Sequence, residues 1–381
     1  MKKFLWAMVV IGLGIFSAAQ APAGSVPAKA KSPAAPSSAA STADWQKKWD
    51  DTVAAAKKEG ELFIYLNAPS EARTIIPEAF KRKYGITLNV ISGSGIELAS
   101  RLVTEYRSGI HQVDAYMAGG TTALVAKAQG VLAPVTPLLI LPEVTSPKAW
   151  FGQNIPFFDK DGTVFTYLSQ VIPPVIYNTG LVKEGQITSY HDLLKPEWKG
   201  KMVMYDPTVG GAASFWFTGL TQELGSDKAN EYLTALAKQQ EVMVTRDMGQ
   251  QMEWVTRGKY PLALFPQTPA VSQYLQAGAP VAAAAFRELT LVANSNGGFA
   301  VPKFPPHPNA ATVFLNWFLS KEGQTLAVKG MGAPSTRIDI PPDNVNPMFV
   351  IKPGQKYILQ SEELTQDTRK WTEGWKKIFA R

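Results

Sequence analysis

Short apolar runs alternate with amphipathic stretches through the first third of the chain, and this alternation constrains the fold more than any other feature. Three apolar runs predict buried strands, namely 61–66 (ELFIYL), 86–91 (ITLNVI) and 113–117 (VDAYM). Each run is followed by a loop rich in Gly, Ser or Thr and then by helical spacing of apolar residues, over 75–84, 96–108 and a third segment that ends at Gly130. Strands that alternate with helices build a parallel sheet covered by helices, so we expect an α/β fold.

A second block of elements is predicted from about Tyr177 onward. It comprises a strand at 201–205, helices at 212–224, 227–239 and 248–257, and a strand at 262–265 that leads into a loop at 266–269. A return segment begins at 289–293, and helices are predicted at 310–321 and 364–379. The 381 residues exceed what one hydrophobic core usually holds, so we expect two domains.

The N-terminal residues are typical of an export signal. Lys2 and Lys3 precede an uncharged run from Phe4 to Phe16, which is shorter than the roughly 20 apolar residues of a membrane-spanning helix. Small residues follow, and cleavage after Ala19 makes residues 1–19 the predicted signal peptide, with a buried N-terminal helix as the alternative. Residues 20–43 are rich in Ala, Pro and Ser and predict a flexible leader. We therefore expect the mature protein in the periplasm.

Several classes of function have no support in the sequence. The chain has no cysteine, which excludes disulfides, thiolate zinc sites and cysteine nucleophiles, and its three histidines lack ligand-like spacing. No P-loop and no G-x-S-x-G motif occurs, so we expect no catalytic residues, no metal and no cofactor. The net charge of +7 is scattered rather than clustered, which argues against nucleic-acid binding but favours the approach of an anion.

Four loops that end at predicted helix starts are the candidate ligand contacts. Helix N-termini carry unpaired N–H groups and a partial positive charge, and strand-to-helix loops of a parallel sheet meet at one edge. The loops contribute Asn67 and Ser70; Ser92, Gly93 and Ser94; Gly119, Gly120 and Thr121; and Thr208, Gly210, Gly211 and Ala212. The alternative is that these residues are plain helix caps and turns.

Four further side chains complete the candidate set. Arg73 and Arg246 could grip an anion through paired hydrogen bonds, although each could equally be a surface arginine. Gln267 follows the strand at 262–265 and should face the ligand, and Tyr177 could contact the ligand or only pack.

Four stretches resemble the bacterial extracellular solute-binding proteins related to the ferric-binding protein and its sugar-phosphate- and phosphonate-binding relatives. These stretches are 55–65 (AAKKEGELFIY), 113–121 (VDAYMAGGT), 175–180 (VIYNTG) with 192–201 (DLLKPEWKGK), and 309–324 (NAATVFLNWFLSKEGQ). The resemblance covers 44–381 and implies the two-lobed clamshell of type 2 periplasmic-binding proteins, with crossover hinge strands and a ligand cleft that closes. It implies lobe 1 at 44–175 plus 294–332 and lobe 2 at 176–293 plus 333–381.

The same resemblance implies partners and a class of ligand. The partners are the permease and ATPase of an ABC importer, and the chain itself is expected as a monomer. Ferric-binding relatives place two adjacent tyrosines after the strand that matches 262–265, whereas this chain has Pro266 and Gln267 there and no Tyr-Tyr pair. We therefore expect a small organic anion, such as a phosphonate, sugar phosphate or carboxylate. Ferric iron, with help from Tyr65, Tyr116 or Tyr205, and a sensory role remain alternatives.

Overall fold

The computed structural model describes residues 38–294, 297–352 and 354–379, with side chains from residue 44 onward. Its contacts divide the chain into two units, Met1–Ser41 and Thr42–Arg381, and the second unit contains both large sheets. The predicted signal peptide and most of the predicted leader lie outside the described residues. Helix α1 (Ser38–Glu59) already includes the last residues assigned to the leader. No helix in the described ranges has the length and apolar character needed to cross a membrane.

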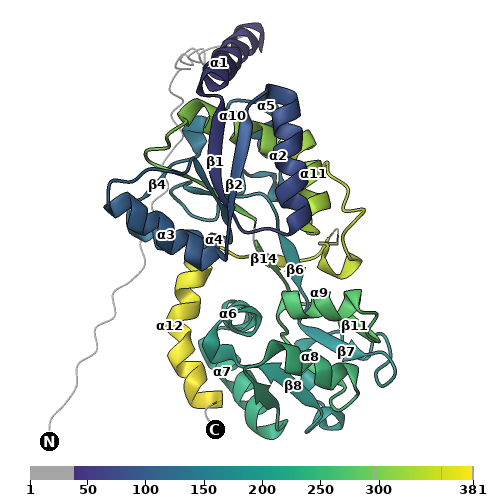
Figure 1. Ribbon diagram of the computed structural model, residues 1–381. Coiled ribbons are helices and arrows are strands. Elements are labelled where there is room, and N and C mark those ends of the chain that lie inside the picture. Colours follow the sequence, from purple (N-terminus) through teal and green to yellow (C-terminus); the bar gives the residue numbers. More distant parts are fainter. Residues whose placement is uncertain (1–37, 295–296, 353, 380–381) are drawn as a thin grey trace, which may run out of the picture. The chain divides into compact units, whose positions relative to one another are not determined.

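The first sheet has the strand order β2-β1-β3-β13-β4, with β5 also paired to β13. Figure 1 shows β1 and β2 of this sheet side by side. Its parallel strands are β1 (Glu61–Leu66), β2 (Thr87–Ser92) and β3 (Ala115–Ala118). The strands antiparallel to them or to one another are β4 (Leu132–Ala133), β5 (Val164–Thr166) and β13 (Gly298–Pro302). The helices that follow the parallel strands are α2 (Ser70–Tyr84), α3 (Gly95–Arg107) and α4 (Gly120–Ala128). The alternation read from the sequence is confirmed, and the fold is α/β.

Two helices from late in the chain complete the packing around this sheet. These are α10 (Pro308–Leu319), which matches the helix predicted at 310–321, and α11 (Lys321–Met331), which was not predicted. Ser320 separates them because its backbone is extended and its hydroxyl accepts a hydrogen bond from the Gly323 amide, which starts a new helix. Phe314 and Trp317 of α10 pack against Phe80 of α2 in the core.

The second sheet has the order β11-β7-β10-β8-β9. Its strands are β7 (Val175–Asn178), β8 (Met202–Tyr205), β9 (Met243–Thr245), β10 (Leu262–Leu264) and β11 (Val281–Ala284). Strand β8 is parallel to β9 and β10, whereas β7 is antiparallel to β10 and β11. The associated helices are α6 (Ala212–Leu224), α7 (Ser226–Thr234) with a π turn at Ala235–Gln239, α8 (Met248–Thr256) and α9 (Thr268–Gln276).

A three-stranded sheet carries both crossings between the two larger sheets. Its strands are β6 (Gln170–Ile172), β12 (Thr290–Ala293) and β14 (Tyr357–Leu359). Along the chain β6 lies between β5 and β7, and β12 lies between β11 and β13, so each crossing passes through this sheet. Helix α12 (Glu362–Phe379) follows β14. The remaining short helices are α5 (Pro142–Thr145) and 3-10 turns at Thr136–Leu138, Pro147–Ala149, Phe151–Gln153, Tyr190–Leu194, Pro196–Trp198, Pro207–Val209 and Pro347–Phe349.

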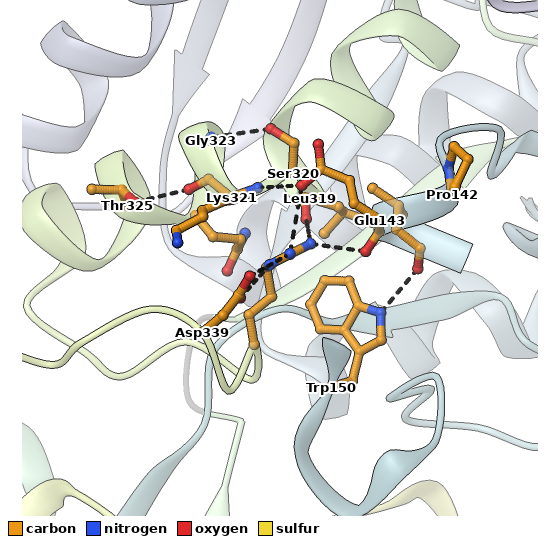
Figure 2. Close-up of polar contacts among 12 residues, drawn as sticks. Pro142, Glu143, Trp150, Leu319, Ser320, Lys321, Gly323, Thr325 and Asp339 are labelled. Carbon is orange, nitrogen blue, oxygen red and sulfur yellow. Dashed lines mark hydrogen bonds and ion pairs between the residues drawn. The ribbon is translucent and has the colours of Figure 1, made fainter. Parts of the chain in front are cut away.

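A buried arginine fastens the segment after α11 to the first sheet's helices. The guanidinium of Arg337 donates to both carboxylate oxygens of Asp339 at 2.9 Å, and to the carbonyls of Glu143 and Leu319 at 3.0 and 3.2 Å. It also lies 5.3 Å from the centre of the Trp150 ring. Figure 2 shows Glu143 of α5, Leu319 at the end of α10, Asp339 of the segment after α11 and the Trp150 ring converging on this point. The guanidinium is thus buried with its donors paired, as a buried charge requires.

Candidate ligand-binding site

A cavity of about 690 Å³ lies where helices from both larger sheets begin. Pro69 and Thr121 come from the first sheet's helices, and Gly211 and Gln267 come from the second. Residues of β6 and β12, the end of α11 and one face of α12 complete the wall. The cavity therefore brings together segments that are far apart in the sequence.

The start of α6 reaches the cavity through two consecutive glycines. Gly210 and Gly211 have φ values of +90° and +88°, a backbone conformation that other residues rarely adopt. The side chain of Gln267 closes over them, because its Oε1 accepts from the Ala212 amide at 3.3 Å and its Nε2 donates to the Gly210 carbonyl at 3.5 Å. A Cβ at Gly211 would lie 1.9 Å from Nε2 of Gln267, so a larger residue at this position would have to displace the Gln267 side chain.

Helix α9 starts at the same wall. Gln267 is its N-cap, and Thr268, Pro269 and Ser272 line the cavity. The sequence predicted a loop through Pro269, and this was wrong because the helix already begins at Thr268. Proline in the first turn is compatible with a helix, since that turn's N–H groups have no intrahelical partner. Helix α9 thus adds a helix start that the sequence reading had missed.

The first sheet contributes the starts of α4 and α2. Thr121 is the second residue of α4, whose N-cap is Gly119. The Gly120 amide donates to the Asn294 side chain at 3.1 Å, which ties this helix start to the end of β12. Pro69 is the N-cap of α2, which begins five residues before the predicted position of 75.

One face of α12 forms the remaining polar wall, through Gln360 just before the helix and Thr365, Thr368 and Arg369 within it. The threonine hydroxyls donate to carbonyls one turn earlier, and that of Thr368 also contacts the Thr218 hydroxyl of α6 at 2.7 Å. Arg369 is exposed and has no hydrogen bond or ion pair within the described part of the chain. It is the only ionisable residue among the described residues that line this cavity.

The predicted loop at 92–95 contributes nothing to the lining. Ser94 and Glu97 form a reciprocal capping box, with Ser94 Oγ accepting from the Glu97 amide and the Glu97 carboxylate accepting from the Ser94 amide at 3.1 Å. Ser92 accepts a hydrogen bond from Arg73 at 3.1 Å, and Gly93 lies between the two serines. The alternative reading of plain caps describes this loop.

Four other predicted residues also lie outside the lining. Asn67 continues the backbone pairing after β1, with its amide donating to Met117 at 2.9 Å, and Ser70 is the first residue of α2. Tyr177 is buried within β7, where burial raises the pKa of its hydroxyl. Thr208 donates to Asp206 from its hydroxyl at 2.6 Å, in the turn before α6.

Arg246 pairs with the same carboxylate, donating from Nε to Asp206 Oδ2 at 2.8 Å. Burial raises the pKa of Asp206, but the hydrogen bonds from Thr208 and Arg246 outweigh it, so the pKa lies below its usual value. Asp206 directly precedes the loop before α6 and Arg246 follows β9, but neither residue lines the cavity. Five of the predicted residues do line the cavity, namely Thr121, Gly210, Gly211, Ala212 and Gln267.

The tyrosines named for iron are not in the lining either. Tyr65 donates to Glu105 at 2.6 Å, and Tyr116 donates to the Gly95 carbonyl at 2.8 Å, where burial raises its pKa to about 12. Tyr205 ends β8. The described lining residues include no aspartate, glutamate, tyrosine or histidine.

Elsewhere in the described residues, three carboxylates lie close enough to share a metal ion: Asp159, Asp161 and Glu362. The ammonium of Lys127 already lies among them, at 2.9, 2.8 and 2.5 Å. Burial lowers the pKa of Lys127, but the hydrogen bonds that its ammonium donates to the three carboxylates raise the pKa by more, so the pKa lies above its usual value. The cluster is therefore an ion-pair network that joins α4 to the start of α12.

Residues 76–347 match the family model described as bacterial extracellular solute-binding protein. The chain belongs to this family. The resemblance read from the sequence is therefore confirmed. A curated relative, iron uptake protein A1 of Synechocystis sp., is 26% identical over 153 residues. That match covers 39% of this chain and 38% of the relative, so it spans well under half of either protein.

Solved structures show the same fold over nearly the whole described chain. The Trichodesmium protein IdiA (FutA), in complex with iron and citrate, superposes with a TM-score of 0.64 at 19% identity, covering 84% of this chain and 98% of that one. AfuA of Actinobacillus pleuropneumoniae, with bound fructose-6-phosphate, gives 0.58 at 20% identity, covering 83% and 99%. A putative extracellular solute-binding protein of Bordetella parapertussis gives 0.67 at 12% identity, covering 85% and 100%. The type 2 periplasmic-binding fold is confirmed.

Proposed function

We propose that this solute-binding protein serves an ABC importer and captures a small organic anion in the cavity of about 690 Å³. The observation that carries the proposal is the lining itself, in which four helix starts meet and no acidic residue occurs among the described positions. The permease and ATPase of the importer are the partners, the periplasm is the location, and the chain acts as a monomer. Lobe 1 of the proposed clamshell comprises residues 44–175 and 294–332, and lobe 2 comprises residues 176–293 and 333–381.

The four helix starts give the cavity a positive potential. Each helix leaves its first amides without an intrahelical partner and places about half a positive charge there. An anion in the cavity would meet such ends from α2 and α4 on one side and from α6 and α9 on the other. With no carboxylate in the described lining, nothing there offsets this positive potential.

A free ferric ion is a poorer match for the same lining. Hard cations bind anionic oxygen ligands, and the described wall offers only neutral oxygens and one guanidinium. A ferric ion chelated by an organic anion is the second candidate, favoured by the Trichodesmium structure, which contains iron together with citrate. Such a chelate brings its own oxygen ligands and presents an anionic surface to the protein.

The test is a thermal-shift screen followed by calorimetry on the purified chain. The probes are inorganic phosphate, methylphosphonate, glucose 6-phosphate, citrate, ferric chloride and ferric citrate. A ligand at 100 times its Kd adds about 2.7 kcal/mol to the free energy of unfolding, so a Tm rise of several degrees is expected with at least one anion. A rise with ferric citrate but not with citrate indicates the chelate. A rise with ferric chloride alone, and with no anion, contradicts the proposal.

A further inference from the structure

We propose that Arg369 on the C-terminal helix α12 binds the anionic group of the solute and so determines charge selectivity. This inference rests on the proposed function, because it assigns a residue to the anion that the cavity is proposed to hold. The main charged contact would then lie on α12 rather than on the glycine-rich loops. Helix α12 lies beyond the residues 76–347 that match the family model.

The first support is the state of the guanidinium. Arg369 lines the cavity, and no carboxylate in the described lining is available to neutralise it. Its five N–H donors have no partner in the described chain, whereas Arg246 is held by Asp206 and Arg73 donates to Ser92. A guanidinium binds phosphate and carboxylate through two parallel hydrogen bonds, so a free one in a cavity wall fits either group.

The second support is the anchoring of α12 at both ends. At its start the Glu362 amide donates to the Phe158 carbonyl at 2.8 Å, and the Glu362 carboxylate accepts from Lys127 of α4. Toward its end Trp375 and Phe379 pack on Phe217 of α6, with ring centres 5.5 and 5.4 Å apart. Figure 1 shows α12 running beside α6 and reaching α4.

The position of Arg369 between these anchors matters for binding. One residue before it, the Thr368 hydroxyl contacts Thr218 of α6, so this turn of α12 is also held. Thr365 and Thr368 precede Arg369 by four and one positions, and all three line the cavity. A donor carried by a fixed helix loses less conformational entropy on binding than one carried by a mobile loop.

The test compares three variants with the wild-type full-length chain. Arg369→Gln removes the charge and keeps much of the volume, and Arg369→Lys keeps the charge but removes the paired donors. Lys370→Gln is the matched control, because it makes the same charge change at the next residue of α12, which does not line the cavity. The probe is whichever anion of the screen raises the wild-type Tm most, and Kd is measured by calorimetry.

We expect Arg369→Gln to raise Kd about 10- to 100-fold, since a hydrogen bond to a charged group is lost. Arg369→Lys should give a smaller rise, and Lys370→Gln should change Kd less than about twofold. Unligated Tm and circular dichroism should match the wild type in all three variants, because Arg369 has no partner to lose. If Arg369→Gln binds the probe as tightly as Lys370→Gln, this inference is overturned while the proposed function stands. If the wild type binds no anion, both are overturned.

Discussion

Arg246 and Asp206 form an ion pair at 2.8 Å that lies outside the cavity lining, although the sequence had made Arg246 a candidate ligand contact. The arginine side chain is 75% exposed, so the pair contributes little to stability. We predict that Arg246→Ala leaves the anion Kd within about twofold of wild type and lowers the free energy of unfolding by at most about 1 kcal/mol. Calorimetry and urea denaturation measure the two quantities. A tenfold loss of affinity would instead place Arg246 at the ligand.

The two glycines before α6 give a prediction about the site's geometry. Gly210→Ala strains the backbone but meets no atom within 4 Å, so we expect a loss of about 1–3 kcal/mol in the free energy of unfolding. Gly211→Ala adds a collision with Gln267 to the same strain, so it should also displace Gln267 and weaken anion binding. Urea denaturation of both variants measures the loss of stability caused by backbone strain, and calorimetry measures the loss of anion binding caused by the collision with Gln267. Equal Kd values for the two would show that Gln267 does not shape the binding site.

The buried guanidinium of Arg337 gives a prediction about stability alone. Arg337→Met leaves Asp339 without its partner and frees the carbonyls of Glu143 and Leu319, so we expect a loss of about 3 kcal/mol. The control is Arg257→Met, which removes an exposed pair with Glu253 and should cost less than about 0.5 kcal/mol. Urea denaturation followed by tryptophan fluorescence reports both. If the two variants lost similar free energies of unfolding, the contacts of Arg337 would stabilise the protein no more than an exposed ion pair does.

The Lys127 cluster predicts a pH dependence. Burial alone would raise the pKa of Asp159. Hydrogen bonds from Lys127, Thr163 and the Val164 amide lower the pKa by more than burial raises it, so the pKa is below its usual value. A carboxyl group with a lowered folded pKa adds stability that is full above the unfolded value of about 3.9 and is lost as pH falls through the folded pKa.

We therefore expect Asp159→Asn to be less stable than wild type at neutral pH, with the difference shrinking below about pH 4. Asp161→Asn, which removes the exposed carboxylate of the same cluster, is the control and should follow the wild-type curve more closely. Urea denaturation at a series of pH values from 3 to 8 measures the effect. A gap between wild type and Asp159→Asn that does not change with pH would refute this account of Asp159.

The parts of the fold that were predicted correctly carry strong local patterns. The strand at 61–66 and the helix at 212–224 have the predicted bounds, since each is marked by an apolar run or helical spacing between glycines. Strands β5, β6 and β14 have only three residues each and pair with partners far along the chain, so no local pattern predicts them.

The candidate site was predicted in part for a similar reason. Glycine-rich helix starts are visible locally, and the loop of Gly210 and Gly211 does line the cavity. The sequence of the loop at 92–95 already indicated that it would not bind a ligand. Ser94 and Glu97 have the spacing of a capping box, in which their side chains pair with the amides that a ligand would otherwise contact. Arg369 was missed because it lies on an ordinary amphipathic helix, and only the fold reveals that this face meets the helix starts.

The wall of the cavity joins Pro69 and Thr121 to Gln360, Thr365 and Arg369, so it draws on both early and late parts of the chain. A ribosome makes the early helix starts long before it reaches α12. A nascent or truncated chain that stops before Arg369 would therefore lack a wall of the pocket even if its first sheet had folded. If the proposed cavity binds the solute, solute capture would report that synthesis has passed α12, which supplies one wall of that cavity.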